Sequence, residues 1–395
     1  MLGFDATPLV VLLASVLKPV DDTRMRGKFA KTLLDRPHTQ VHVAGRRPTG
    51  DSADSPTEIE APRLFLHPIF NGSRLSLNRL AAQWRYWCLL HRLAPAVVIV
   101  HAPELLPLTL LWQGLGRKRN FLYDIRENYA LNVSTQRVYG GLARRLLSAG
   151  LRWVETQAAR RAVGLLLAEA SYADELPFLQ TQADNRVVIL ENKYQPAPNE
   201  AFGIEPRSLP PPHEPLRLLY SGTISELNGV WEAIAVTEQL RTAWPGGARL
   251  TIMGFCQQPA LLRQLQAKIA QHPLVLTLIG GAELVPHTRI VAEIALSHLG
   301  LLPYRPHPST EYCRPTKLFE YLAHGLPVIA SPNPLWQAQL DQYAAGLPLD
   351  FAQPVDGPAL VARLRQSVFY PAGVPKSVLW ADEGKKLWLL LDSVI

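Results

Sequence analysis

The sequence predicts an α/β protein with two doubly wound, parallel-sheet domains. Short apolar runs alternate with segments of helical periodicity along the whole chain, which is the pattern of buried parallel strands joined by helical crossovers. Seven prolines fall within residues 194–215, between the two halves of this pattern. At 395 residues the chain is too long for one compact core, and its 48% hydrophobic and 18% charged residues are an ordinary globular composition.

Each half of the chain contributes its own series of strands. In the first half, apolar runs predict strands at residues 9–15, 40–44, 96–100, 120–124 and 187–190, and a helix over residues 24–34. In the second half, they predict strands at 216–221, 249–253, 275–279, 298–302 and 328–330, and helices over 231–241 and 257–271. We therefore expect a first domain over residues 1–194, a linker over 195–215 and a second domain over 216–372. A terminal helix within residues 373–395 either packs back on the first domain or ends the second.

The cysteines and apolar segments exclude several protein classes. Cys88, Cys256 and Cys313 lie far apart without metal-ligand spacing, which argues against a disulfide framework or structural zinc and favours a reducing compartment. Residues 8–16 are apolar but lack a basic leader and a cleavage site, so they predict a strand rather than a signal peptide. No stretch reaches the roughly 18 apolar residues of a membrane span. We expect a cytoplasmic protein, either free or at the cytoplasmic face of the membrane.

The basic excess lies entirely in the first half. Residues 1–195 hold 25 lysines and arginines against 17 acidic residues, whereas residues 196–395 hold 15 against 16. Two helical segments carry basic clusters beside tryptophans: Arg74, Arg79, Arg85 and Arg92 in the first, and Arg144, Arg145, Arg152, Arg160 and Arg161 in the second. Such helices suit an anionic membrane surface; the alternative is two ordinary surface helices that pack on the sheet. A nucleic-acid partner is not expected, because the basic residues are dispersed and no known binding module is present.

The stretch over residues 314–331, RPTKLFEYLAHGLPVIAS, predicts one helix–strand step with charged residues early in its helix. Its apolar residues recur at helical spacing, Gly325 ends the helix, and a short apolar strand follows. Lys317 and Glu320 lie one turn apart near the helix N-terminus. An ammonium and a carboxylate placed there can hold a phosphate and a ribose diol, and the alternative is a capping charge pair.

This stretch resembles the carboxylate-bearing helix of GT-B glycosyltransferases, particularly of the retaining glycosyltransferase family four. The resemblance implies two Rossmann-like domains that face a central cleft, with the second domain holding a nucleotide-sugar donor. Glu320 matches the second glutamate of the family motif, which grips the donor ribose. The first glutamate would fall at Tyr312, so Glu311, one position earlier, is the candidate catalytic residue at the donor sugar.

The donor diphosphate is expected at a glycine turn. Gly222 follows a predicted strand, where glycine permits a tight turn and brings backbone N–H groups close to a phosphate. The turn resembles the one that opens the second GT-B domain, although Asn228 stands where the family often has a lysine. Arg314 and Lys317 are the candidates to replace that charge. The resemblance implies these donor-binding residues: Glu320, Lys317, Arg314, Gly222, Thr223, Gly254 and Thr316.

Two strand ends of the first domain supply the acceptor-side candidates. The segment KPVDDTR, with Asp22 and Arg24, resembles a variant of a family loop that faces the cleft; the alternative is a helix cap by Asp22. The segment DIREN resembles a D-x-H-E-N cluster, with Arg126 where histidine is common. Because arginine stays protonated, Arg126 cannot be a general base but can hold a carboxylate or phosphate of the acceptor.

The remaining catalytic candidates are Glu127 and His101. Glu127 can orient Arg126 or contact substrate, and a structural ion pair between these two residues is the alternative. His101 follows another predicted strand and is the best-placed imidazole of the first domain; the alternative is a structural role, which is the commoner one for a lone histidine at a strand end.

The resemblance implies a glycosyltransferase that moves a sugar from a nucleotide-diphosphate sugar to a glycan, lipid-linked or small-molecule acceptor, with retention of configuration. It also implies that no metal is required, and the chain has no DxD motif. Two alternatives share the fold: a non-catalytic nucleotide-sugar-binding subunit, which the two departures from the family motifs leave open, and a nucleotide-sugar epimerase.

Overall fold

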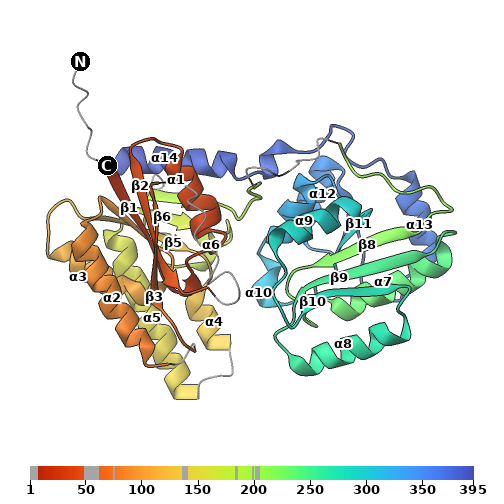
Figure 1. Ribbon diagram of the computed structural model, residues 1–395, viewed down its shortest axis with the longest axis horizontal. Coiled ribbons are helices and arrows are strands. Elements are labelled where there is room, and N and C mark those ends of the chain that lie inside the picture. Colours follow the sequence, from red (N-terminus) through yellow and green to blue (C-terminus); the bar gives the residue numbers. More distant parts are fainter. Residues whose placement is uncertain are drawn as a thin grey trace. The chain divides into compact units, whose positions relative to one another are not determined.

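The computed structural model describes residues 8–48, 62–73, 76–135, 141–182, 186–197, 200 and 205–395. Its contacts divide the chain into two units, Met1–Gln195 with Trp380–Ile395, and Pro196–Leu379 (Figure 1). Each unit holds one parallel sheet, so the predicted pair of Rossmann-like domains is confirmed. Arg74, one of the predicted basic residues, lies outside the described residues. No helix in the described part of the chain is both long and apolar enough to cross a membrane.

The first unit has a seven-stranded sheet in the order β3-β2-β1-β4-β5-β6-β7. Its strands are β1 (Leu9–Pro19), β2 (Thr39–Arg46), β3 (Leu64–Phe70), β4 (Val97–Val100), β5 (Asn120–Ile125), β6 (Gly164–Leu167) and β7 (Val187–Ile189). Its helices are α1 (Lys31–Leu34), α2 (Asn78–Leu93), α3 (Leu106–Gly114), α4 (Tyr129–Thr135), α5 (Gly141–Arg161), α6 (Tyr172–Glu175) and α14 (Ala381–Val394). The chain order changes direction between β1 and β4, so this unit has a topological switch point at those strand ends.

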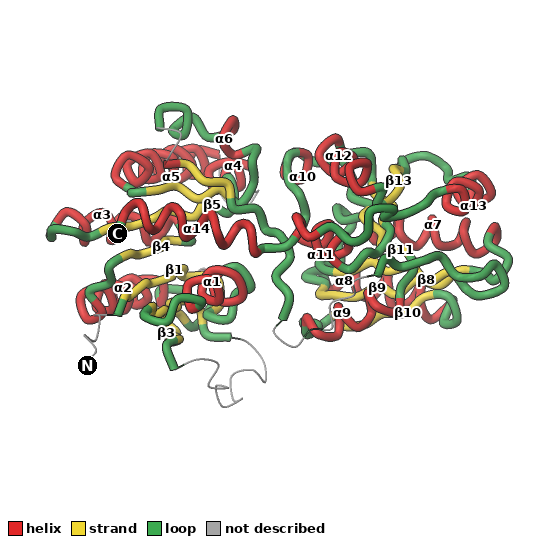
Figure 2. Tube along the Cα trace, turned by 90° about the horizontal axis from the view of Figure 1, so that it is seen from above, coloured by secondary structure: helices red, strands yellow, loops and turns green. Residues whose placement is uncertain are grey.

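Two apolar layers cover the two faces of this sheet. Helices α2, α3 and α5 supply the apolar residues on one face. The other face is covered by a π-helix over Met25–Ala30, by α1 and by the terminal helix α14. Trp380, which precedes α14, and Leu387 within it are buried in the same apolar cluster. Figure 2 shows α14 running across the sheet of the first unit. The last residues of the chain are therefore part of the first unit's core.

The second unit has a six-stranded sheet in the order β10-β9-β8-β11-β12-β13. Its strands are β8 (Leu216–Ser221), β9 (Ala248–Phe255), β10 (Leu276–Gly281), β11 (Leu299–Leu302), β12 (Val328–Ala330) and β13 (Gly346–Pro348). Its helices are α7 (Val230–Ala243), α8 (Pro259–Gln271), α9 (His287–Leu296), α10 (Pro308–Glu311), α11 (Thr316–Ala323), α12 (Pro334–Tyr343) and α13 (Gly357–Gln366). Here the switch point lies between β8 and β11.

Three strands were not predicted from the sequence. The strands β3 and β13 are edge strands, and each contains a proline, a residue that is confined to edges because it cannot donate to the ladder. The strand β6 is only four residues long and directly follows the long helix α5, so its apolar run merges with the helical pattern. The expected helix at residues 24–34 begins at Met25; it is a π-helix over Met25–Ala30 and continues as the α-helix α1.

Candidate functional site

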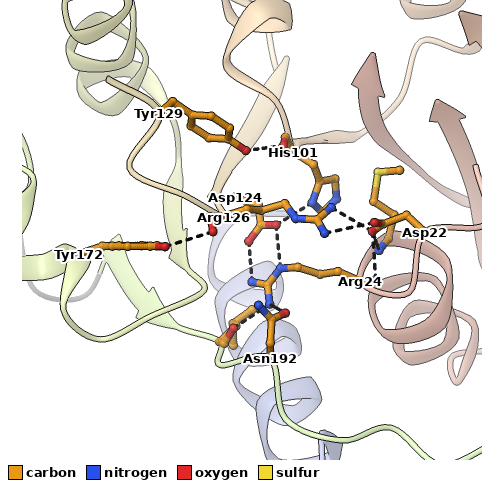
Figure 3. Close-up of polar contacts among 10 residues, drawn as sticks. Asp22, Arg24, His101, Asp124, Arg126, Tyr129, Tyr172 and Asn192 are labelled. Carbon is orange, nitrogen blue, oxygen red and sulfur yellow. Dashed lines mark hydrogen bonds and ion pairs between the residues drawn. The ribbon is translucent and has the colours of Figure 1, made fainter. Parts of the chain in front are cut away.

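A buried charge network occupies the carboxyl ends of β1, β4 and β5 in the first unit (Figure 3). The Asp124 carboxylate is fully buried and accepts two hydrogen bonds from the Arg24 guanidinium, at 2.9 Å from Nε and 2.6 Å from Nη2. It also lies 2.7 Å from Nδ1 of His101. Burial alone would raise the pKa of Asp124, but Arg24 and His101 lower it overall, so the carboxyl stays ionised.

Arg24 was expected to contact the acceptor, but in the structure its guanidinium is bound within this network. Its side chain is 1% exposed, and its remaining donor bonds go to the Leu190 carbonyl and to Oδ1 of Asn192, at 2.9 and 2.8 Å. The guanidinium therefore joins three strand ends inside the unit and cannot meet an acceptor there. A buried Arg–Asp pair with every polar group satisfied is an architectural element.

His101 is also closed off from solvent. Its side chain is 0% exposed, and burial lowers its pKa despite the neighbouring Asp124, so the neutral imidazole donates from Nδ1 to the carboxylate. Tyr129 donates to the His101 carbonyl at 3.3 Å. The His101 side chain therefore has no exposed surface through which to meet a substrate in this structure, and its action on substrate stays a prediction.

Arg126 and Asp22 form a second pair at the edge of the network. Arg126 donates from Nη1 and Nη2 to the two carboxylate oxygens of Asp22, at 2.9 and 3.2 Å, and both side chains are about one-tenth exposed. Asp22 also accepts from the backbone N–H groups of Arg24 and Met25, each at 3.0 Å. The N-cap residue is Arg24, without a side-chain cap bond, so the solvated cap at Asp22 is not formed as predicted. The structural ion pair between Arg126 and Glu127 is not formed.

Glu127 is the most open of the first-unit candidates. Its carboxylate lies 3.6 Å from the Lys18 ammonium and accepts from the Asn132 amide at 3.0 Å, and its side chain is 45% exposed. Glu127 and the Arg126–Asp22 pair are therefore the predicted residues of this unit that reach its surface.

In the second unit, glycines bring the carboxyl ends of β8 and β9 into backbone contact. The Gly222 N–H donates to the Met253 carbonyl at 2.8 Å, and a Cβ on Gly254 would come within 1.7 Å of the Gly222 carbonyl oxygen. Both glycines have positive φ, +100° at Gly222 and +148° at Gly254. Only glycine at these two positions permits so close an approach.

The Lys317 side chain ends at this glycine turn. A Cβ on Gly222 would lie 2.3 Å from Cε and 2.8 Å from Nζ of Lys317, so the absent side chain leaves room for the ammonium. The ammonium lies 5.1 Å from the ring centroid of Tyr220 and 5.2 Å from that of Tyr304. Burial lowers the pKa of Lys317 to about 8, although Glu320 acts in the opposite direction. A partly desolvated cation thus faces the β8–β11 switch point.

Glu320 lies one turn further along α11 and contacts a residue that the sequence did not indicate. His287, the first residue of α9, has Nε2 at 2.6 Å from Oε1 of Glu320. The Glu320 side chain is 12% exposed and that of His287 is 45% exposed. The two residues are 33 positions apart in the sequence, and no local pattern links them.

The other donor-side candidates occupy different places. Glu311 is exposed at the end of α10 and lines a cavity of about 620 Å³ with Tyr304, Arg305 and Asn333, but neither Glu320 nor Lys317 lines that cavity. Thr316 is exposed at the first position of α11, Arg314 precedes that helix, and Thr223 is exposed after the glycine turn. Asn228 donates its amide to the Thr223 carbonyl at 2.9 Å, so it holds the turn instead of supplying charge.

Within the described residues, no group of three or more His, Cys, Asp or Glu side chains is arranged to hold a metal ion. The expectation that no metal is required stays a prediction.

Two parallel sheets of seven and six strands, each with its switch point at the carboxyl strand ends, give this chain the fold of the GT-B glycosyltransferases. HepE from Anabaena, solved with UDP and glucose, superposes with a TM-score of 0.64 and 12% identity over 98% of this chain and 100% of that chain. The lipopolysaccharide outer core galactosyltransferase WaaB gives 0.61 and 12% over 98% and 99%.

WaaG, a glycosyltransferase of lipopolysaccharide biosynthesis, gives a TM-score of 0.59 with 17% identity over 98% of both chains. At the level of sequence alone, no protein-family model matches the chain, and no curated protein matches it either. The fold resemblance predicted from the stretch at residues 314–331 is confirmed.

Proposed function

We propose that this protein is a glycosyltransferase that uses a nucleotide-diphosphate sugar as donor and retains the anomeric configuration. The observation that carries the proposal is the Lys317 ammonium at the Gly222 turn, at the switch point where doubly wound sheets bind their ligands. The fold supports it, because HepE of the same fold binds UDP-glucose. The acceptor would be a glycan, a lipid-linked saccharide or a small molecule.

In this proposal the second unit holds the donor. The diphosphate lies at the Gly222 turn, where backbone N–H groups and the Lys317 ammonium neutralise it, with Arg314 and Thr316 at the start of α11 nearby in sequence. Because the leaving diphosphate gains negative charge as the glycosidic bond breaks, a fixed cation there stabilises the transition state. Glu311 borders the adjoining cavity, where it can contact the donor sugar.

Glu320 would accept hydrogen bonds from the ribose diol in the same site. A carboxylate can accept from both hydroxyls at once, and such charge-assisted bonds are stronger than neutral ones. His287 already holds one Glu320 oxygen, so it fixes the carboxylate for the ribose. Removing the carboxylate should therefore cost affinity for every nucleoside diphosphate, whatever its base.

The test is a calorimetric screen with nucleoside diphosphates and nucleotide sugars. The wild type should bind at least one of them, and Glu320→Ala should lose that binding. Glu311→Gln is the matched control, because Glu311 lies away from the ribose contact and should keep nucleoside diphosphate affinity within about twofold. Unchanged binding by Glu320→Ala would remove Glu320 from the site.

Turnover separates the enzyme from its alternatives of the same fold. The position of Asn228, which holds a turn where the family often has a cation, favours a non-catalytic binding subunit as the second candidate. Release of nucleoside diphosphate with a glycosylated product supports transfer, and an altered free sugar nucleotide supports an epimerase. Binding without release from any donor would support the binding subunit. We also propose that EDTA leaves transfer unchanged.

We further propose that the protein contacts the cytoplasmic face of an anionic membrane through α2. Leu77 at its start, Leu80 and Trp84 are 84%, 70% and 67% exposed, and Arg85 and Arg92 lie exposed on the same helix. Apolar and basic side chains on one exposed helix suit anionic lipid headgroups. Sedimentation with vesicles of anionic and neutral lipid tests this, and equal recovery of Trp84→Ala and wild type on anionic vesicles would contradict it.

A further inference from the structure

An open pocket of about 610 Å³ lies in the first unit between α4 and α5. These two helices lie side by side next to the sheet (Figure 1). The pocket begins at Asn128, three residues beyond the end of β5, and extends along α5 past Arg152, Ser148, Arg145 and Arg144. It therefore adjoins the loop that carries Arg126 and Glu127, on the same side of the sheet as the carboxyl strand ends.

The sequence of α5 builds one wall of this pocket. Residues 144, 145, 148 and 152 recur at intervals that place them along one side of a helix. Ser148 donates to the Ala130 carbonyl at 2.9 Å, which fixes α4 against α5. The basic side chains thus lie along a groove between two helices, α4 and α5, that a hydrogen bond connects.

The pocket has an excess of positive charge. Arg152 donates to Oδ1 of Asn128 at 2.9 Å and lies 3.7 Å from the buried carboxylate of Glu155, so its position is fixed. Arg144 and Arg145 have no hydrogen bond or ion pair to any residue that the structure describes. Glu175 is the acidic residue of the lining, and the Asn128 amide already donates to it at 3.1 Å.

A pocket lined by three arginines and one glutamate is suited to an anion with several oxygens. Guanidinium binds phosphate through two parallel N–H···O bonds, a geometry that a single ammonium cannot give. The lining also includes an apolar side chain, since Leu131 is 38% exposed. A phosphate attached to an apolar group could therefore lie here as well as a soluble one.

We propose that this pocket binds a phosphate group of the acceptor, so that the proposed glycosyltransferase acts on a phosphorylated acceptor. The inference rests on the proposed function, because it needs the loop with Arg126 and Glu127 to be the acceptor side. The same chemistry holds whether the phosphate is borne by a soluble molecule or by a lipid. In this proposal the Arg144 and Arg145 side chains donate hydrogen bonds to the phosphate. Arg152, which Asn128 and Glu155 hold in place, lies at the inner end of the site.

The test uses the full chain with Arg144→Gln/Arg145→Gln and the matched control Arg160→Gln/Arg161→Gln. The control makes the same charge change on the same helix, but outside the pocket. Arg152 is left intact because it pairs with buried Glu155. Inorganic pyrophosphate is titrated by calorimetry in the presence of excess nucleoside diphosphate, which occupies any donor site.

The pocket variant should bind pyrophosphate roughly tenfold or more weakly than the control, because two charge-assisted contacts are lost. A second arm measures binding to vesicles with and without phosphatidic acid. A selective loss there identifies a lipid-borne phosphate, and a loss with pyrophosphate alone identifies a soluble one. Equal behaviour of the two double variants in both arms would overturn the proposal.

The proposed function is tested separately by titrating the same variants with nucleoside diphosphate alone. Both double variants should bind it like the wild type, since neither changes the second unit. Absence of nucleotide binding in all of them would contradict the donor site while leaving the pyrophosphate result interpretable for the pocket.

Discussion

The carboxyl strand ends of the two units differ in how their charges are satisfied. In the first unit, Arg24 pairs with Asp124 and Arg126 pairs with Asp22, at distances of 2.6 and 2.9 Å. In the second unit, no carboxylate in the described part of the chain lies within ion-pair distance of the Lys317 ammonium, which instead faces two aromatic rings and a glycine turn. The arginines of the first unit already have carboxylate partners within the protein, so they are not available to a ligand. The partly desolvated Lys317 ammonium, beside the backbone of the Gly222 turn, is available to an anionic ligand.

The largest effect expected from this comparison is on stability. Asp124→Asn removes the charge that pairs with the buried Arg24 guanidinium, and breaking one side of a buried ion pair costs about 3–5 kcal/mol. Urea unfolding of the variant should show this loss. Asp392→Asn, which breaks the exposed Arg36–Asp392 pair, is the control and should change stability far less. Equal effects would contradict an architectural role for Asp124.

The second prediction concerns the contact between the glycine turns. Gly254→Ala places a Cβ 1.7 Å from the Gly222 carbonyl oxygen, so the turn must shift, at a cost of about 1–3 kcal/mol. Nucleoside diphosphate binding should fall with it. Gly373→Ala is the matched control, because Gly373 also has positive φ but a Cβ there meets nothing within 4 Å. Retained nucleotide binding in Gly254→Ala would separate this turn from the donor site.

The third prediction is a pH dependence of donor binding. Lys317 has a pKa lowered to about 8, so the free protein loses this charge as the pH rises through that value. A bound diphosphate would hold the proton, and affinity should therefore fall by up to about tenfold per pH unit above pH 8. Calorimetric titrations between pH 7 and pH 9.5 measure this. A pH-independent affinity would show that Lys317 does not contact the ligand.

The smallest expected effect is that of Glu127→Gln on stability. Its carboxylate is 45% exposed and lies 3.6 Å from Lys18, and such surface pairs contribute about 0–1 kcal/mol. The thermal unfolding temperature should therefore be nearly unchanged. If Glu127 contacts the acceptor, the variant should instead transfer the sugar more slowly. A large loss of stability would place Glu127 with Asp124 among the architectural residues.

Local patterns in the sequence were sufficient to predict much of the second unit. The strands Leu216–Ser221 and Val328–Ala330 have the predicted bounds, and α11 begins and ends within the stretch that predicted it, because apolar periodicity and Gly325 are local signals. The edge strands β3 and β13 carried no comparable signal, since proline and partial exposure interrupt their apolar runs.

The partners of the site residues could not be predicted in the same way. Arg24 and Asp124 are 100 positions apart, and His287 and Glu320 are 33 apart, so only the folded sheet brings them together. A sequence segment can indicate that an arginine follows a strand, but it cannot indicate whether that arginine is buried against a carboxylate or open to a substrate. Burial decided the role of Arg24.

The most direct test of the central claim compares a nucleoside diphosphate with the monophosphate of the same base. If the Lys317 ammonium holds the donor diphosphate, the wild type should prefer the diphosphate, and Lys317→Met should reduce that preference roughly 10-fold or more by removing a charge-assisted bond. Monophosphate affinity should change much less, and Lys385→Met, at an exposed lysine of α14, should leave both unchanged. An undiminished preference in Lys317→Met would contradict the claim.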